Sequence, residues 1–128
     1  MTAKIIDGKK IADGILEELK KKVGDLKQKP GLAIVLVGNN PASEIYVGSK
    51  LKKAESAGFY VEKHALPEKI TQNELLRLVD ELNQNKNVHG FIVQLPLPKH
   101  INENRVIDSI LPHKDVDGFT PVNLGNLV

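Results

Sequence analysis

The chain has 128 residues, 41% hydrophobic and 27% charged, a composition usual for one folded domain and unlike that of a disordered or fibrous protein. Its 18 basic and 16 acidic residues leave a formal net charge of +2, and with three Phe, two Tyr and no Trp for base stacking we expect no nucleic-acid partner. No apolar run reaches the ~18 residues of a membrane span, so we expect no membrane partner. No cysteine is present for disulfide, zinc or thiol chemistry. We expect one cytoplasmic domain over residues 1–128.

The first half of the chain predicts two helices that alternate with two strands. Apolar residues recur at helical spacing over 11–26, after Asp7 as a cap. The continuous apolar run 32–37 is typical of a strand that is covered on both faces. The range 40–57 begins with an Asn cap and a Pro at the first helical position, and the more polar run 59–66 predicts a strand nearer the edge of a sheet.

The second half predicts the same alternation. Thr71 and Glu74 have the spacing of a capping box at the start of a third helix. A third strand is expected over 88–95 and a short fourth helix over 102–112, whereas 113–128 shows little periodicity and reads as an unfinished connection. This order predicts an α/β fold of three layers, αβα, with a small, mostly parallel sheet and helices on both faces.

Candidate site residues follow from the rule that ligands bind beyond the carboxyl ends of parallel strands. Tyr46 and Lys50 lie four residues apart, hence on one face of the helix that follows the first strand. Gln94 is polar at the end of an apolar strand, and Pro96 and Pro98 stiffen the loop after it. A lysine in a helix is usually a surface residue, but these neighbours favour a partly shielded amine that exchanges protons with a small-molecule ligand.

Other short motifs argue against common cofactors. The turn 38–40 lacks the glycine spacing of a phosphate-binding loop or a dinucleotide fingerprint. The run 114–118 lacks the later oxygen ligands of a calcium loop and predicts a turn, although its carboxylate Asp117 would suit a ring with an amidine-like N–C–N edge, as in a pterin. The four histidines are scattered, so we expect no metal site.

Three segments in this order resemble the methylenetetrahydrofolate dehydrogenase/cyclohydrolase family of bifunctional folate enzymes: 46–54, 90–98 and 114–118. The likeness runs from about Ile5 to the last residue. It implies oxidation of 5,10-methylenetetrahydrofolate to 5,10-methenyltetrahydrofolate with NADP, followed by hydrolysis to 10-formyltetrahydrofolate, as part of one-carbon metabolism and purine biosynthesis. It also implies that residues 1–128 are the N-terminal, tetrahydrofolate-binding catalytic domain.

The resemblance further implies roles for individual residues. Lys50 would be the catalytic lysine, acting at the one-carbon bridge and activating water during hydrolysis. Gln94 would hydrogen-bond Lys50 and tune its protonation, Tyr46 would stack on the folate, and Asp117 would grip the pterin edge. These four are the expected catalytic residues. The expected substrate-binding residues are Tyr46, Lys50, Gln94, Leu95, Pro96 and Asp117.

The family carries its NADP site in a C-terminal Rossmann domain for which this chain has no residues, so we expect the chain alone to lack dehydrogenase activity. The resemblance also implies a homodimer for the full-length protein, tetrahydrofolate as substrate and no metal. Two alternatives stay open on the residues themselves. The chain is a non-catalytic folate- or pterin-binding module, or it is a structural domain in which Tyr46, Lys50, Gln94 and Asp117 do not converge.

Overall fold

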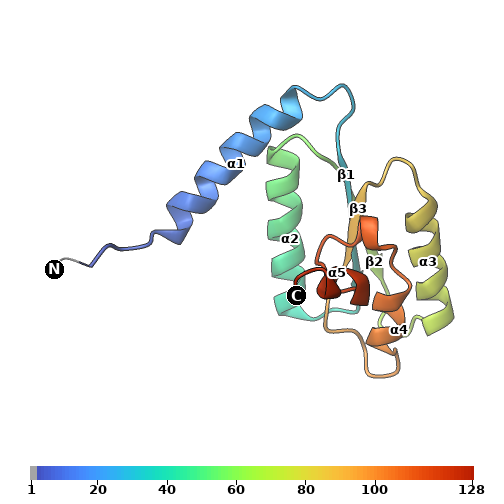
Figure 1. Ribbon diagram of the computed structural model, residues 1–128. Helices are drawn as coiled ribbons and strands as arrows, with labels where there is room; N and C mark the ends of the chain where they lie inside the picture. Colours follow the sequence, from blue (N-terminus) through green and yellow to red (C-terminus); the bar gives the residue numbers. More distant parts are fainter. Residues whose placement is uncertain (1–2) are drawn as a thin grey trace.

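The computed structural model describes residues 3–128, which form a three-stranded parallel sheet with helices along both faces (Figure 1). The strand order is β2-β1-β3. The strands are β1 Gly31–Val37, β2 Tyr60–Leu66 and β3 Gly90–Val93. The helices are α1 Gly8–Gly24, α2 Pro41–Ser56, α3 Gln72–Gln84, α4 Glu103–Asp108 and α5 Pro121–Gly125, and η1 Pro112–Lys114 is a single 3-10 turn. The predicted three-layer α/β architecture is confirmed.

Strand β1 lies at the centre of the sheet because its side chains are apolar on both faces. Val35 pairs with His64 of β2 on one side and with Val93 of β3 on the other. Ala33 and Ile34, which point to opposite faces, are both fully buried. A strand buried on both faces is the arrangement that a continuous apolar run predicts.

Each face of the sheet has its own apolar cluster. On one face α3 and α4 pack against the sheet, and α3 starts at the predicted capping box, in which Thr71 and Glu74 bond each other's backbone amides. On the other face α2 packs through Val47, which is fully buried. Asn40 caps α2 by accepting a hydrogen bond from Ser43 N at 3.1 Å, so the start of this helix is fixed beside the end of β1.

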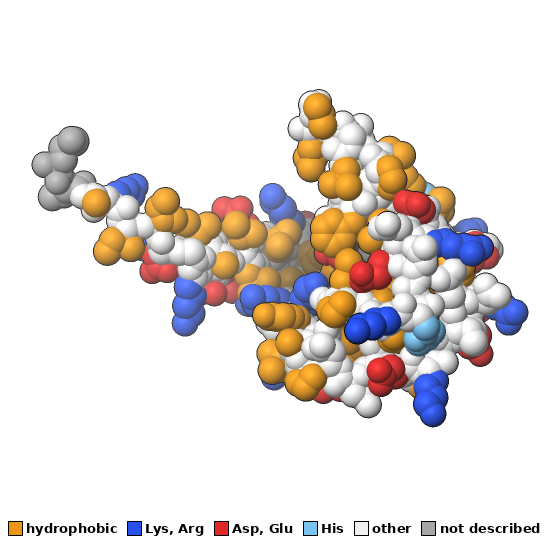
Figure 2. Space-filling model, turned by 90° about the horizontal axis from the view of Figure 1, so that it is seen from below, with side chains coloured by type: hydrophobic (Ala, Val, Ile, Leu, Met, Phe, Trp, Pro, Cys, Tyr) orange, Lys and Arg blue, Asp and Glu red, His pale blue; other side chains and the backbone are white. Residues whose placement is uncertain are grey.

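Helix α1 forms where the spacing predicts it but adds little to the core. Its cap is Asp7, which accepts a hydrogen bond from Lys10 N at 3.0 Å. The helix extends away from the sheet (Figure 1). Hydrophobic side chains are visible along this arm in the space-filling view (Figure 2). Ile11 is 53% exposed, and Val23 is the one buried residue of the helix. Over residues 3–128 no helix has both the length and the apolar character needed to cross a bilayer.

The expected end of the fourth helix near Pro112 is wrong, and the stretch 113–128, expected to be an unfinished connection, contains short helical elements. Helix α4 stops at Asp108, and the following residues form η1 and α5. Thr120 caps α5, and Pro121 occupies its first turn. Elements of three to five residues are too short to show a periodic pattern, so only their caps mark them in the sequence.

Candidate functional site

The carboxyl ends of β1 and β3 bring Lys50 and Gln94 together. Lys50 Nζ donates a hydrogen bond to Gln94 Oε1 at 3.0 Å, across 44 residues of sequence, and both side chains are partly buried. Gln94 is held on its other side as well, since its Nε2 donates to Leu95 O at 2.9 Å and its backbone N donates to Val35 O at 2.9 Å. With Nε2 committed to a carbonyl, Oε1 is the amide atom that faces the lysine. The predicted contact between Lys50 and Gln94 is therefore present.

Helix α2 places Tyr46 one turn before Lys50. The helix is fixed to the sheet by Val47, so neighbouring positions project from a rigid element. The Tyr46 side chain is 60% exposed, which leaves its ring free to cover a flat ligand. Its stacking role stays a prediction.

Asp117 lies in the turn between η1 and α5 and is electrostatically linked to Lys50. Partial burial raises the pKa of the Asp117 carboxyl, the positive charge of Lys50 lowers it, and the negative charge of Asp115 raises it again, with a net rise. The charge of Lys50 thus acts on the carboxyl of Asp117, while the Lys50 amine is hydrogen-bonded to the amide of Gln94. A carboxylate can bind an amidine-like edge through paired hydrogen bonds, so the arrangement suits the ring proposed from the sequence.

A hydrogen-bond network that the sequence did not reveal holds this turn in place. The carboxylate of Asp115 accepts hydrogen bonds from Gly118 N at 3.0 Å, Thr120 N at 2.8 Å and Asn123 Nδ2 at 3.0 Å. Burial acts to raise the pKa of Asp115, but the hydrogen bonds from Thr120 and Asn123 outweigh it, and the pKa lies below the usual 3.8. An Asp three residues before a Gly is the sequence signal of such a turn.

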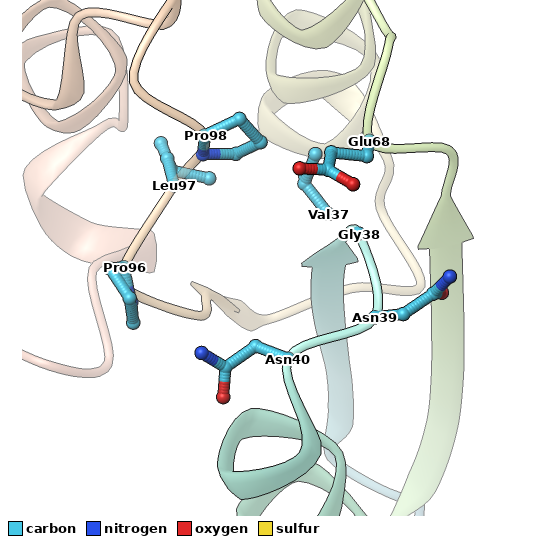
Figure 3. Close-up of a pocket in the computed structure, with 8 residues that line it drawn as sticks. All are labelled: Val37, Gly38, Asn39, Asn40, Glu68, Pro96, Leu97 and Pro98. Atoms are coloured by element: carbon cyan, nitrogen blue, oxygen red, sulfur yellow. The ribbon is translucent and has the colours of Figure 1, made fainter.

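A cavity of about 330 Å³ opens at the same edge of the sheet (Figure 3). The turn after β1 borders it on one side and the loop after β3 on the other, with Glu68 from the turn after β2 also in its wall. Among the predicted site residues Pro96 alone lines this cavity, which therefore does not enclose the Lys50–Gln94 pair. No pattern in the sequence pointed to Glu68. The complete lining is Val37, Gly38, Asn39, Asn40, Glu68, Pro96, Leu97 and Pro98.

The turn after β1 does not fit the pyrophosphate of a dinucleotide cofactor. The turn between β1 and α2 would have to bring backbone amides to a pyrophosphate. Here Asn40 already accepts the first-turn amide of Ser43, and the turn has a single glycine, Gly38. This turn therefore lacks the free amides and the close backbone approach that a pyrophosphate needs. Within residues 3–128, no three His, Asp or Glu side chains are grouped so that they could hold a metal ion.

Comparisons with known proteins agree on one family. The family model for the tetrahydrofolate dehydrogenase/cyclohydrolase catalytic domain matches residues 6–117. The bifunctional protein FolD of Moorella thermoacetica is 53% identical over 131 residues, covering 100% of this chain and 47% of that protein. The crystal structure of the bifunctional enzyme FolD from Campylobacter jejuni has a TM-score of 0.92 at 50% identity, covering 94% of this chain and 44% of that one.

The Trypanosoma brucei methylenetetrahydrofolate dehydrogenase-cyclohydrolase, solved in complex with NADP cofactor and an inhibitor, has a TM-score of 0.94 at 38% identity. The match covers 99% of this chain and 45% of that one. The chain thus spans less than half the length of each of these relatives.

Proposed function

The chain belongs to the tetrahydrofolate dehydrogenase/cyclohydrolase family, and from this we propose that it is the folate-binding catalytic domain of a bifunctional enzyme. The complete enzyme would oxidise 5,10-methylenetetrahydrofolate to 5,10-methenyltetrahydrofolate with NADP and hydrolyse the product to 10-formyltetrahydrofolate. Residues 1–128 would be its N-terminal domain, a proposal that the partial coverage of longer relatives supports.

The hydrogen bond between Lys50 and Gln94 carries the proposal. In the hydrolysis, water adds to the methenyl carbon and loses one proton, which leaves a hydroxyl group on that carbon. The hydroxyl then loses its proton as the C=O bond forms, the bond from the carbon to N5 breaks, and N5 takes up a proton, so that one proton is released overall. No electrons are transferred. A lysine amine held by an amide oxygen keeps a defined direction, and in its neutral form its lone pair accepts the proton that the water loses. Gln94 would therefore orient this base.

The remaining residues would bind the substrate. Asp117 would accept paired hydrogen bonds from the amidine-like edge of the pterin. The exposed ring of Tyr46 would stack on the folate, and Leu95 and Pro96 would border the ring system on the side of β3. Each of these contacts places a flat, polar-edged ligand against the amine of Lys50.

The dehydrogenase reaction belongs to the complete protein. Hydride transfer requires a nicotinamide positioned against the substrate, and the turn after β1 does not fit the dinucleotide. The NADP-bound relative supports NADP as the cofactor of the complete enzyme. We propose accordingly that the chain by itself lacks dehydrogenase activity and contributes the folate site and the catalytic lysine.

The setting of the enzyme is proposed from the family resemblance. We propose a cytoplasmic homodimer that acts in one-carbon metabolism and purine biosynthesis, with no metal and no nucleic-acid or membrane partner. The cysteine-free composition supports the location. Measuring the mass of the full-length protein in solution tests the dimer.

Two measurements on the purified chain test the function. Binding of 5-formyltetrahydrofolate, an air-stable folate with the same pterin edge, should be measurable by calorimetry and should weaken by about tenfold or more in Asp117→Ala, the loss expected for a charge-assisted hydrogen bond. Hydrolysis of 5,10-methenyltetrahydrofolate should be faster with the chain than with Lys50→Met, while the exposed Lys52→Met serves as the matched control.

The outcomes separate the alternatives. Binding without lysine-dependent turnover would identify a non-catalytic binding module. An absence of binding in the chain, or an affinity that Asp117→Ala leaves unchanged, would contradict the folate site. Lysine-dependent turnover would support the catalytic domain directly.

A further inference from the structure

Lys114 is a buried, basic side chain that has no role in the proposed reaction or in the proposed substrate contacts. It is one of three buried polar side chains among the described residues, with Ser43 and Thr120. Its ammonium donates hydrogen bonds to Leu82 O at 2.8 Å and to Asn85 O at 2.8 Å. Burial lowers the pKa of Lys114. Burying a charge costs free energy unless its partners compensate, so an apolar residue of similar length would be the simpler solution if packing were the only requirement.

The two carbonyls that Lys114 binds belong to the end of α3. The last carbonyls of a helix lack intrahelical partners and carry the negative end of the helix dipole, so a cation there is stabilised. An ammonium with three donors can join two such carbonyls at once and thereby fix the direction of the chain that bears it. Lys114 thus ties the end of η1 to a rigid helix of the main core.

The residues after Lys114 are held just as closely. Asp115 forms a parallel bridge with Phe91 of β3. The approach is close because β3 begins with Gly90, where an added Cβ would lie 2.6 Å from the side chain of Val116. The carboxylate of Asp115 then binds the amides of Gly118 and Thr120. Residues on both sides of Asp117 in the sequence are therefore anchored by hydrogen bonds, and Lys114 is the first of these anchors.

We propose that Lys114 is a positioning residue: its ammonium fastens the 115–118 turn to the end of α3, so that Asp117 stays at the folate site beside Lys50. This inference rests on the proposed function, in which Asp117 binds the pterin edge. It adds a residue that touches neither ligand nor reacting atoms and yet controls the affinity.

A double-mutant cycle tests the coupling. Affinity for 5-formyltetrahydrofolate is measured for the chain, for Lys114→Met, for Asp117→Ala and for the double variant, at a temperature at which all are folded. Lys114→Met alone should weaken binding about tenfold, and the double variant should bind no more weakly than Asp117→Ala. An equal loss from Lys114→Met in both backgrounds, or no loss at all, would overturn the proposal, because a general loss of stability does not depend on Asp117.

A second readout needs no ligand and separates this proposal from the proposed function. In Lys114→Met the amides of Gly118 and Thr120 should exchange with solvent at least tenfold faster, relative to the amide of Val35 in the central strand. Lys52→Met is the matched control and should leave this ratio unchanged. A uniform rise at all three amides would mean a merely structural role. If the chain itself fails to bind the folate, the proposed function fails while the exchange ratio still decides whether Lys114 anchors the turn.

Should Lys114→Met not fold, Lys114→Arg is taken through the same cycle and the same exchange measurement. Its guanidinium keeps the charge but has a planar geometry and a longer reach. The expected result is an intermediate loss of affinity that again depends on Asp117. A variant with unchanged affinity and a faster-exchanging turn would contradict the link between the anchor and the ligand.

Discussion

Helix α1 and the segment 113–120 differ in how well their sequence pattern predicts their burial in the structure. Helix α1 has a regular apolar stripe, a cap and 17 residues, yet most of its apolar side chains are exposed. The segment 113–120 shows no periodicity, yet it contains Lys114 and Thr120, two buried polar side chains, and is fixed by side-chain hydrogen bonds to the backbone.

The difference separates two kinds of information in a sequence. Periodicity reports the conformation of the backbone and which side chains share a face, but not whether another element covers that face. Polar residues in irregular segments report specific hydrogen bonds, whose partners are distant in the sequence. We therefore expect substitutions in the segment 113–120 to cost more stability than substitutions in α1, and the following predictions test this order.

The largest effect is expected for Asp115→Ala. The substitution leaves the amides of Gly118 and Thr120 without their acceptor, and an unsatisfied buried donor costs about 1–3 kcal/mol. Urea unfolding at pH 7 measures the loss. Asp13→Ala, on the exposed surface of α1, is the control and should change little. Equal losses in the two variants would contradict the comparison.

Protonation of Asp115 at low pH should remove part of the stability that its carboxylate contributes to the folded chain. Because the pKa of Asp115 in the folded chain is below its usual 3.8, the folded state favours the carboxylate, and the contribution is complete above that usual value. It is lost as the pH falls through the lower, folded pKa. The difference in unfolding free energy between the chain and Asp115→Asn should therefore shrink between pH 7 and pH 3. A constant difference would show that the charge of Asp115 is not responsible.

A smaller and more local effect is expected for Asp7→Ala. Loss of an N-cap costs about 1 kcal/mol of helix stability. Since α1 shares few buried contacts with the core, the loss should appear as faster exchange of the amides of α1, including Lys10, and not as a lower midpoint of global unfolding. Asp7→Asn keeps the capping oxygen and should behave like the chain itself. A lower global midpoint would show that α1 unfolds together with the sheet.

The smallest effect is expected for Ile11→Ala. The side chain is about half exposed, and alanine favours the helix, so the free energy of unfolding should change by no more than about 0.5 kcal/mol. Urea unfolding measures this as well. A loss greater than about 1 kcal/mol would mean that the apolar stripe of α1 is covered in solution.

The candidate site could be predicted in part. The positions of Tyr46 and Lys50 on one helical face follow from helix geometry, and the ends of two parallel strands meet at one edge of a sheet, which brings Gln94 near Lys50. Glu68 at the cavity and the anchoring role of Lys114 could not be predicted, since a cavity wall and a helix carbonyl become partners only when distant segments pack.

By itself, the sequence determined the alternation of helices and strands, the buried central strand and the capped helix starts, because these depend on residues close together along the chain. Tertiary structure alone decided that α1 has an exposed apolar face and that the charge of Lys50 acts to lower the pKa of Asp117. It also decided that the buried ammonium of Lys114 donates hydrogen bonds to carbonyls at the end of α3. Burial and the pairing of charges arise between segments far apart in the chain, and for that reason no local pattern contains them.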